Sequence, residues 1–413
     1  MKKMTNWEEL EWRGLVKDVA GEDIAKKINE ESICFYWGTD PTADSLHLGH
    51  YSSLVTAKRL MKMGHKPILL CGGATGRIGD PRPTSEREII SIETLNNNIK
   101  GIQKQIDAIF DGNVKLVNNY DWFKGYEFLD FLRDIGKYVN VNYMLSKDII
   151  NRRLETGITY AEFSYMLIQG YDFLNMYQKM NCTMQVAGSD QWGNITTGID
   201  LIRKILGKEA YGFTMPLILD ANGKKFGKSE GNALWLDINK TSSYQLYQYL
   251  INTDDSKVEE YLKVFTFLTR EEIEKIVEEH QKQPELRLAQ RKLAECIITD
   301  LHGKEEYEKA LKISEALFTD KINTLTKEDI VKNLNTVPKV ELTEGNIVDV
   351  LVESKVFASK REARELISGN ALSLNNVKVN DLNYTINKEN AIDGEIYLIR
   401  KGKKNYFIGQ FKD

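Results

Sequence analysis

The stretch ICFYWGTDPTADSLHLGHYSSLVTAKRLMKMGHKPILLCG, residues 33–72, contains two short apolar segments with a helical pattern between them. Residues 33–39 and 67–72 have the length and composition of buried strands, whereas apolar residues recur at helical spacing over 49–64. A strand, a helix and a second strand within about 40 residues make a βαβ unit, which requires parallel strands. The sequence therefore predicts an α/β fold.

The rest of the chain divides by pattern. Strands are predicted at 114–119 and 183–190, and a strand or hairpin in FTMPLILDANGKK, 213–225. Helical periodicity with dense charge then follows over 241–318, and a polar stretch over 319–344 resembles a linker. A helix and short strands with Asn-rich turns form a compact tail over 345–413. We expect four parts: 1–240, 241–318, 319–344 and 345–413.

Composition excludes several classes of protein. Hydrophobic content is 42% and charged content 28%, which is ordinary for a globular protein. The longest apolar runs fall far short of the roughly 20 residues of a membrane-spanning helix, and no secretory signal is predicted. The four scattered cysteines form no CxxC pair, which is typical of reduced thiols in a cytosolic protein.

The tail carries a small excess of positive charge, which is compatible with a local RNA-binding patch there. The net charge is −4, which argues against a nucleic-acid-binding field over the whole molecule. Residues 345–413 hold 11 Lys and Arg against 9 Asp and Glu, so this tail is positive by 2 and the remainder is negative by 6.

Two of the five histidines, His47 and His50, lie one helical turn apart at the start of the predicted helix, with Gly49 between them. A metal site would need a third ligand, and the glutamate of the helical zinc signature is missing. Two surface histidines without a role are a second interpretation. The third is phosphate binding, because a helix N-terminus attracts anions and imidazoles can donate to phosphate oxygens.

The segment DANGKKFGKSEGN, 220–232, invites comparison with a P-loop, but its glycines are separated by three residues where that motif has four. A solvated basic loop is the simplest interpretation. The functional alternative is a mobile loop in which Lys225, Lys228 and Ser229 close on a leaving pyrophosphate.

Three further segments place polar residues where a ligand crevice is expected. GGATGRIGDP, 72–81, leaves a strand and contains Asp80, and SDQWGN, 189–194, contains Asp190 and Gln191. In YMLIQGYD, 165–172, Tyr165, Gln169 and Asp172 share one helix face. Turn capping for Asp80 and ordinary packing for the helix face remain alternatives.

Together, HLGH after the first strand and KFGKS after a late one resemble the paired signatures of class I aminoacyl-tRNA synthetases. The fuller strings DPTADSLHLGH, GGATGRIGDP, NNYDW, YxxxQxxD and SDQWGN resemble bacterial-type tyrosyl-tRNA synthetases, and the likeness runs over essentially the whole chain. It implies a Rossmann-like catalytic domain, a helical anticodon-binding domain and a tail domain like the one named for ribosomal protein S-four.

The resemblance also implies residue roles. The catalytic set would act on the ATP phosphates: His47, His50, Lys225, Lys228 and Ser229. The tyrosine-binding set would include a pair for the phenolic hydroxyl, Tyr36 and Asp172, and a group for the ammonium: Asp80, Tyr165, Gln169 and Gln191. The nucleotide would contact Gly38, Asp40, Thr42, Gly49, Ser53, Asp190 and Lys228.

The implied reaction joins tyrosine to ATP as tyrosyl-AMP, releases pyrophosphate, and then transfers tyrosine to the terminal ribose of its tRNA. Mg²⁺ would accompany ATP, and no other metal site is expected. The resemblance further implies a cytoplasmic homodimer with no membrane attachment. In the tail, RNA would contact Lys360, Arg361, Arg364, Lys403 and Lys404; solvated charge is the alternative.

Two departures from the family pattern concern the nucleotide. Trp37 stands where the family often has a small residue beside the ribose. The loop GDPRPTSER is one residue shorter than the common form and lacks its usual lysine, which leaves Arg82 or Arg87 as substitutes.

Three rival functions stay open. The tryptophan-specific relative shares the fold and both signatures, but Tyr36, Asp172 and the tail module argue against it. An RNA-binding protein that has kept the synthetase fold is disfavoured by intact HLGH and KFGKS. A nucleotidyltransferase without tRNA would not need the helical and tail domains.

Overall fold

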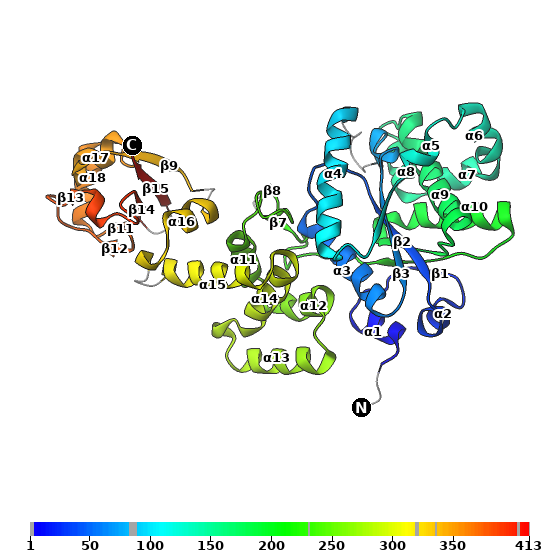
Figure 1. Cartoon of the computed structure of the whole chain (residues 1–413), viewed down its shortest axis with the longest axis horizontal. Helices are drawn as coiled ribbons and strands as arrows, with labels where there is room; N and C mark the ends of the chain where they lie inside the picture. The colour runs from blue at the N-terminus through cyan, green and yellow to red at the C-terminus, as the bar shows by residue number, and fades with distance from the viewer. Residues whose placement is uncertain are drawn as a thin grey trace. The chain divides into compact units, whose positions relative to one another are not determined.

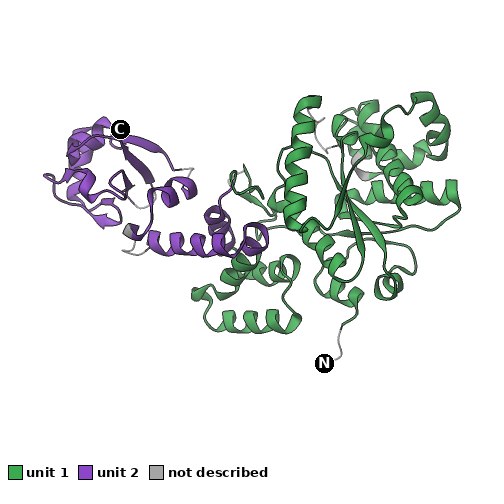
Figure 2. Cartoon of the chain, in the orientation of Figure 1, with its two compact units in different colours: residues 1–240, 253–296 green, residues 241–252, 297–413 purple. Residues whose placement is uncertain are grey.

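The computed structural model describes residues 4–81, 89–229, 232–318, 322–334, 337–402 and 405–412. Contacts divide the chain into two compact units (Figure 2). Unit 1 consists of residues 1–240 and 253–296, and unit 2 of residues 241–252 and 297–413. The expected four-part division stays a prediction, and no helix in the described part of the chain is long and apolar enough to cross a membrane.

Unit 1 is built on a six-stranded sheet in the order β1-β6-β5-β2-β3-β4. The strands are β1 Val19–Ala20, β2 Cys34–Thr39, β3 Lys66–Cys71, β4 Lys115–Asn118, β5 Met184–Gly188 and β6 Tyr211–Met215. All neighbouring pairs are parallel except β1 with β6. The predicted βαβ unit is β2, α3 and β3, so the α/β class is confirmed.

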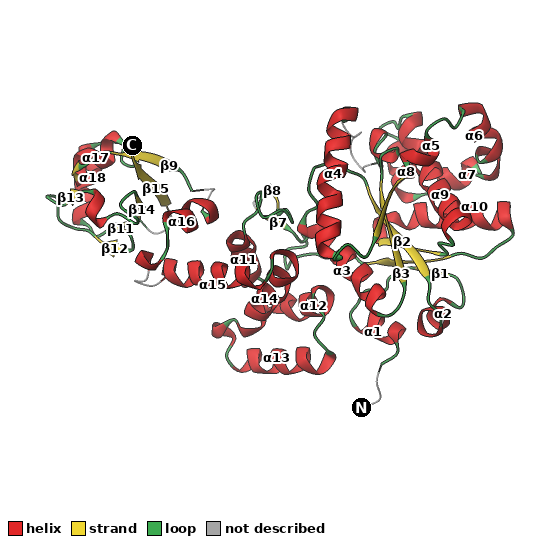
Figure 3. Cartoon of the chain, in the orientation of Figure 1, coloured by secondary structure: helices red, strands yellow, loops and turns green. Residues whose placement is uncertain are grey.

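Helices cover both faces of this sheet (Figures 1 and 3). Ile68 and Leu70 of β3 and Val117 of β4 share one core cluster with side chains of α9 and α10. On the sheet, α3 contacts β3 and β5. The helices before residue 160 are α1 Asn6–Trp12, α2 Ile24–Glu30, α3 Leu48–Lys62, α4 Ile92–Ile109, α5 Tyr120–Phe123, α6 Phe128–Asp134, α7 Val141–Leu145 and α8 Asp148–Leu154. The later helices are α9 Tyr160–Met180, α10 Trp192–Leu206, α12 Asp255–Phe265 and α13 Arg270–Lys282, and the hairpin strands are β7 Lys228–Ser229 and β8 Asn232–Ala233.

Unit 2 combines helices with a second sheet. Its helices are α11 Ser243–Ile251, α15 Lys304–Phe318, α16 Lys327–Asn333, α17 Ile347–Glu353 and α18 Lys360–Ser368, and α14 Leu288–His302 contains the boundary between the units. Its strands are β9 Lys339–Leu342, β10 Gly345–Asn346, β11 Leu372–Leu374, β12 Val377–Lys378, β13 Thr385–Ile386, β14 Ile396–Lys401 and β15 Asn405–Phe411. The tail is α+β, as predicted.

Local chemistry accounts for the turns of the tail. Leu374 pairs with Val377, so only Asn375 and Asn376 connect β11 to β12. Both asparagines have positive φ, 47° and 63°, which a tight two-residue hairpin requires and asparagine tolerates.

Within the stretch expected to be a linker, β9 pairs with β15 and several apolar side chains are buried. Ile322, Ile330 and Leu334 pack with Ile396 and Ile408 of the tail sheet. Some of the apolar side chains of this stretch are therefore part of the core of unit 2.

Candidate active site

The site lies where the chain changes direction across the sheet. From β2 the chain proceeds to β3 and β4 on one side, and it returns to β5 and β6 on the other side of β2. The carboxyl ends of these parallel strands share one edge, and the switch point between β2 and β5 leaves a crevice there. A cavity of about 430 Å³ occupies this position.

This cavity brings together nearly all the site residues predicted from the sequence. They line it from β2, α3, the segment after β3, α9, the segment after β5 and the hairpin after β6: Tyr36, Gly38, Asp40, Thr42, His47, Gly49, His50, Ser53, Asp80, Tyr165, Gln169, Asp172, Asp190, Gln191, Lys225 and Lys228. Ser229 follows in β7, but its side chain lies outside the described residues.

The two histidines are fixed by backbone hydrogen bonds at the start of α3. His47 is the N-cap, and its Nδ1 accepts a bond of 3.1 Å from the Gly49 N–H. The Nδ1 of His50 accepts a bond of 3.3 Å from the His47 N–H. Because both Nδ1 atoms accept, these bonds assign the ring protons to Nε2. Each imidazole therefore keeps an Nε2–H as a donor.

Both imidazoles are neutral at pH 7. Their rings stack with centroids 3.8 Å apart, and Trp37 meets the His50 ring edge-on at 6.5 Å. Burial, and then the neighbouring His47, lower the pKa of His50 to about 3. Burial, followed by the charge of Lys228, also lowers the pKa of His47. The pair therefore offers N–H donors and no positive charge at this pH.

At the other end of the cavity, a buried carboxyl group faces a tyrosine hydroxyl. Asp172 is 1% exposed, and its two oxygens accept bonds from Asn119 Nδ2 at 3.0 Å and Trp122 Nε1 at 2.8 Å. Burial raises the pKa of Asp172 to about 8 despite these two donors. Among the described residues the buried Tyr36 hydroxyl has no hydrogen-bond partner, and burial and then Asp172 raise its pKa well above the usual value. Two buried polar groups, the Tyr36 hydroxyl and the Asp172 carboxyl, thus line the same cavity.

A second polar cluster carries several carboxylates. Asp40 accepts from the Tyr165 hydroxyl at 2.9 Å and from the Thr75 hydroxyl at 2.7 Å. Gln191 Nε2 donates to Asp80 at 2.8 Å and to Asp190 at 3.3 Å. Three carboxylates on one cavity wall favour a cationic group. The structure thus joins Tyr165, expected at the ammonium, directly to Asp40, expected at the nucleotide.

The KFGKS segment lies against the start of α3. Gly227 has φ 85°, and a Cβ there would stand 2.7 Å from the Gly49 nitrogen. The Leu48 N–H donates to Leu234 O at 2.7 Å, and the Leu234 N–H donates to Gly227 O at 2.9 Å. The two signature motifs are therefore in direct backbone contact, which only a glycine at 227 permits.

Sequence reasoning misses the partners of Asp172 and several other cavity residues, among them Gln185. Asn119 and Trp122 belong to the NNYDW string, but the sequence alone predicts no role for either residue. Asn119 follows β4 directly and so lies at the carboxyl edge of the sheet. Gln185 is 2% exposed, pairs in register with Tyr36 and lines the cavity. Its inward position on β5 gives no sequence signal, because neighbouring residues are apolar on both faces.

In the tail, three predicted RNA-contacting residues lie exposed on α18. Lys360 pairs with Asp349 at 2.7 Å, and Arg361 pairs with Glu365 at 3.0 Å; Arg364 lies on the same helix. Lys403 and Lys404 lie outside the described residues, as do Arg82 and Arg87 of the shortened loop. Within the described ranges no group of three or more His, Cys, Asp or Glu is arranged to hold a metal ion.

Comparison with known proteins identifies two family models. The model of class I tRNA synthetases for tryptophan and tyrosine matches residues 27–319. The model of the C-terminal domain of SYY-like tyrosine–tRNA ligases matches residues 329–409.

Individual proteins resemble the chain over nearly its whole length. A tyrosine–tRNA ligase of Staphylococcus carnosus is 46% identical over 420 residues, which cover 99% of this chain and 100% of that protein. Tyrosine–tRNA ligase 1 of Bacillus subtilis is 46% identical over 422 residues, with 99% and 100% covered. A crystal structure of a C-terminally truncated mitochondrial tyrosyl-tRNA synthetase from Aspergillus nidulans superposes with a TM-score of 0.68 at 34% identity, and covers 77% of this chain and 95% of that one.

Proposed function

The chain belongs to the class I tRNA synthetases of the tryptophan and tyrosine group, and we propose how its residues carry out the reactions of a tyrosyl-tRNA synthetase. In the first reaction a carboxylate oxygen of L-tyrosine attacks the α-phosphorus of ATP. The bond from that phosphorus to the bridging oxygen breaks, which gives tyrosyl-AMP and pyrophosphate. In the second reaction the tyrosyl group passes to the 3′-terminal ribose of tRNA(Tyr).

The buried hydroxyl of Tyr36 beside Asp172 is the observation that carries the assignment of tyrosine. The substrate phenol would accept a hydrogen bond from Tyr36 and donate one to Asp172, which satisfies both groups. Phenylalanine would leave them unpaired in a water-excluded pocket, so it is rejected by desolvation and not by size. Asn119 and Trp122 hold the Asp172 carboxyl in one orientation.

The carboxylate cluster would bind the ammonium group of the substrate. Asp80 and Asp40 lie on the cavity wall, and Gln191 and Tyr165 orient them through bonds of 2.8 and 2.9 Å. Gln169 lines the same cavity from α9. With its phenol and ammonium groups held at two sites, tyrosine has its carboxylate as the remaining free group, and this is the group that must attack.

No protein nucleophile is required, so the phosphate end works by positioning and charge stabilisation. The neutral His47 and His50 would donate from Nε2 to phosphate oxygens at the α3 N-terminus. Lys225 and Lys228 would balance the charge that develops on pyrophosphate. Mg²⁺ would enter as part of the ATP substrate. The nucleotide would lie along a set of residues that line the cavity: Gly38, Asp40, Thr42, Gly49, Ser53, Asp190 and Lys228.

The helical segment 241–318 and the tail would bind tRNA. Exposed Lys360, Arg361 and Arg364 on α18, together with Lys403 and Lys404, are suited to phosphate contacts. We assign anticodon recognition to 241–318 and backbone contacts to 345–413, with 319–344 between them. The cytoplasm, which holds tRNA and ATP, is the proposed compartment.

The enzyme is proposed to work as a homodimer through an apolar surface of unit 1. Four large side chains between residues 128 and 160 are more than half exposed: Phe128 by 62%, Leu129 by 76%, Val141 by 57% and Tyr160 by 65%. A second copy of the chain would cover them in a two-fold interface. Sedimentation equilibrium should give twice the chain mass, and Leu129→Asp should shift it toward the monomer; a monomeric wild type would exclude this arrangement.

The experiment that tests the function is amino-acid-dependent exchange of labelled pyrophosphate into ATP without tRNA. All twenty amino acids are tested with wild type and with Lys228→Ala. Exchange with tyrosine alone, reduced at least tenfold in the lysine variant, supports the assignment. Exchange with tryptophan would move the chain to the sister specificity, and none with any amino acid would refute adenylate formation.

A further inference from the structure

Phe226, the aromatic residue of KFGKS, is buried in a cluster that joins three elements of unit 1. Its ring stacks on Phe265 of α12 with centroids 4.5 Å apart and lies 4.6 Å from the ring of Tyr261 on the same helix. Phe265 also stacks on Tyr51 of α3, with ring centroids 6.0 Å apart and the ring planes 5° apart. One side chain of α12 therefore contacts both the lysine loop and the helix that begins at the histidine pair.

Residues 218–226 form a hairpin that ends in the first residues of KFGKS, and we call it the lysine hairpin. Helix α12 also binds the arm of this hairpin that precedes the turn. The Tyr261 hydroxyl donates to Leu219 O at 2.9 Å, and Leu219 pairs with Lys225 across the hairpin. The Phe226 N–H closes the hairpin by donating to Ile218 O at 2.9 Å. Both arms, on either side of the turn at Gly223, are thus attached to α12.

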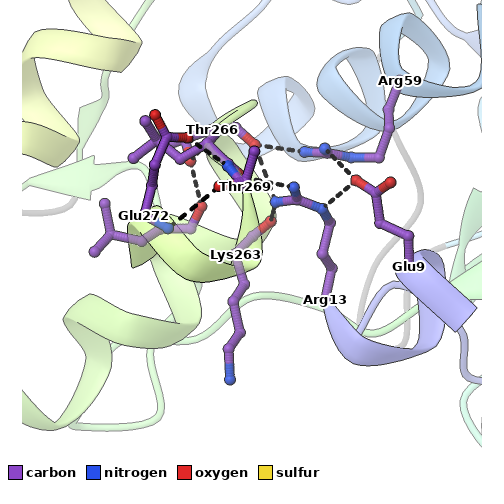
Figure 4. A network of polar contacts seen from close by, with 9 residues as sticks. Glu9, Arg13, Arg59, Lys263, Thr266, Thr269 and Glu272 are labelled. Carbon is purple, nitrogen blue, oxygen red and sulfur yellow. Dashed lines mark hydrogen bonds and ion pairs between the residues drawn. The ribbon is translucent and has the colours of Figure 1, made fainter. Parts of the chain in front are cut away.

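The C-terminal end of α12, where Tyr261 and Phe265 also lie, is fixed to α1 and α3 by two buried arginines (Figure 4). Arg13 donates to Lys263 O at 2.8 Å, to Thr266 O at 3.2 Å and to Leu268 O at 2.7 Å. Arg59 donates to Thr266 O at 2.6 Å, and Glu9 accepts from both guanidinium groups, at 2.8 and 3.3 Å. The helix C-terminus, where the carbonyls carry partial negative charge, suits these cations.

The arginine contacts matter because Arg59 belongs to α3. A single helix, α3, carries the histidine pair at one end and Arg59 near the other. The C-terminal end of α12 therefore contacts α3 at two places, Tyr51 and Arg59. Arg13 and Arg59 are only 4% and 3% exposed, so solvent competes little for these bonds.

From these contacts we infer that α12 positions the KFGKS hairpin for adenylate formation, with Tyr261 and Phe265 as the positioning residues. The inference rests on the phosphate-binding roles proposed for Lys225 and Lys228. Preplaced cations stabilise a developing charge because they need no reorganisation during the reaction. A hairpin released from α12 would spend less time in place, which lowers the rate of the activation step and leaves the tyrosine pocket intact.

Two conservative substitutions test the inference, each with a matched control. Tyr261→Phe removes one bond to the hairpin, and Tyr397→Phe removes an equivalent bond of 2.8 Å from a tyrosine that is 1% exposed in the tail. Phe265→Leu removes the stack, and Phe110→Leu makes the same change at a fully buried site at the end of α4. The controls report the general cost of altering a buried aromatic residue.

The readouts separate positioning from stability. Tyr261→Phe should lower the single-turnover rate of adenylate formation about two- to tenfold, the range for one neutral hydrogen bond. Tyrosine affinity should stay within twofold of wild type. Phe265→Leu should also speed tryptic cleavage after the exposed Lys224 and Lys225, located by mass spectrometry. Neither control should change the rate or the cleavage.

Lys228→Ala distinguishes failure of this inference from failure of the proposed lysine roles. If Lys228→Ala slows adenylate formation while Tyr261→Phe and Phe265→Leu leave the rate and the cleavage unchanged, α12 is not a positioning element. Equal losses in the α12 variants and their controls, or a parallel loss of tyrosine affinity, would also overturn the inference. An unaffected Lys228→Ala would refute the lysine role itself.

Discussion

Replacing Asp172 by asparagine should selectively damage the use of tyrosine. The side chain keeps its size, but an NH2 group, which cannot accept a hydrogen bond, replaces one of the two oxygens that accept from Asn119 and Trp122. Asp172 is 1% exposed and already accepts from Asn119 and Trp122, so no solvent or neighbouring group replaces the lost interaction. The damage should therefore fall on the bond to the phenol.

The magnitude follows from the kind of bond that is lost. Because the pKa of Asp172 is about 8, the carboxyl is mainly neutral at pH 7, and a hydrogen bond between neutral groups contributes about 0.5–1.5 kcal/mol. The value of kcat/KM for tyrosine should therefore fall about two- to tenfold in Asp172→Asn. Tyr36→Phe removes a neutral bond of about 0.5–1.5 kcal/mol, which corresponds to about two- to tenfold. Both are small beside the rejection of phenylalanine by about 10⁵, a value established for tyrosyl-tRNA synthetases as a class and not obtained from this structure.

The assay is pyrophosphate exchange with tyrosine and with phenylalanine on wild type and on each variant. Phenylalanine has no hydroxyl to contact Asp172, so its kcat/KM should change little and serves as the internal control. The ratio of the two kcat/KM values should fall by the factors above. A ratio unchanged in both variants, with tyrosine and phenylalanine affected equally, would refute the hydroxyl-reading role of this pair.

Three other predictions concern acid stability, the hairpin glycine and RNA binding. Burial lowers the pKa of His50 to about 3, whereas the unfolded chain takes up a proton near pH 6.5; the free energy of unfolding should therefore fall below about pH 6.5. His50→Asn should lessen that fall by about 2 kcal/mol between pH 7 and 5 in urea titrations, and an identical pH dependence in both proteins would contradict the shift. Gly227→Ala should slow adenylate formation at least tenfold, whereas Gly223→Ala, with a similar φ of 78° and open space for a Cβ, should not; equal effects would show that backbone strain alone is responsible. Alanine at Lys360, Arg361 and Arg364 together should reduce the slope of log affinity for tRNA against log salt by about two to three and leave exchange unchanged, so an unaltered slope would remove α18 from the RNA surface.

The sheet could be predicted from sequence because its strands are short apolar runs bounded by glycine. The ends of β2, α3 and β3 lie within two residues of the ends expected from the sequence. Glycines and changes between apolar and polar residues mark these ends in the sequence. The edge strand β1 was not predicted: two residues, Val19 and Ala20, are too few to show a period. Likewise, polarity suggested a linker over 319–344, because single apolar residues such as Ile322 and Ile330 show their partners only in the folded tail.

Most of the cavity follows from one rule, that carboxyl ends of parallel strands meet at one edge. That rule alone is enough to place His47, Asp80 and Asp190 together, and all three line the cavity. The bonds from Asn119 and Trp122 to Asp172 do not follow from it, because they join β4 and α5 to α9 across about 50 residues without a local pattern. The contact of Tyr261 with Leu219 is equally invisible in the sequence, since helical periodicity shows that one face is buried but not what covers it.

The most direct test of the proposed two-step reaction and its selection of tyrosine is to isolate the enzyme after mixing it with ATP and labelled amino acid, and then to add tRNA(Tyr). With tyrosine, labelled adenylate should remain bound through gel filtration and pass to the tRNA on its addition; with phenylalanine under the same conditions, none should be retained. Equal retention of both amino acids would contradict selection by Tyr36 and Asp172. Retained tyrosyl-adenylate that never reaches tRNA would contradict the assignment of the complete reaction.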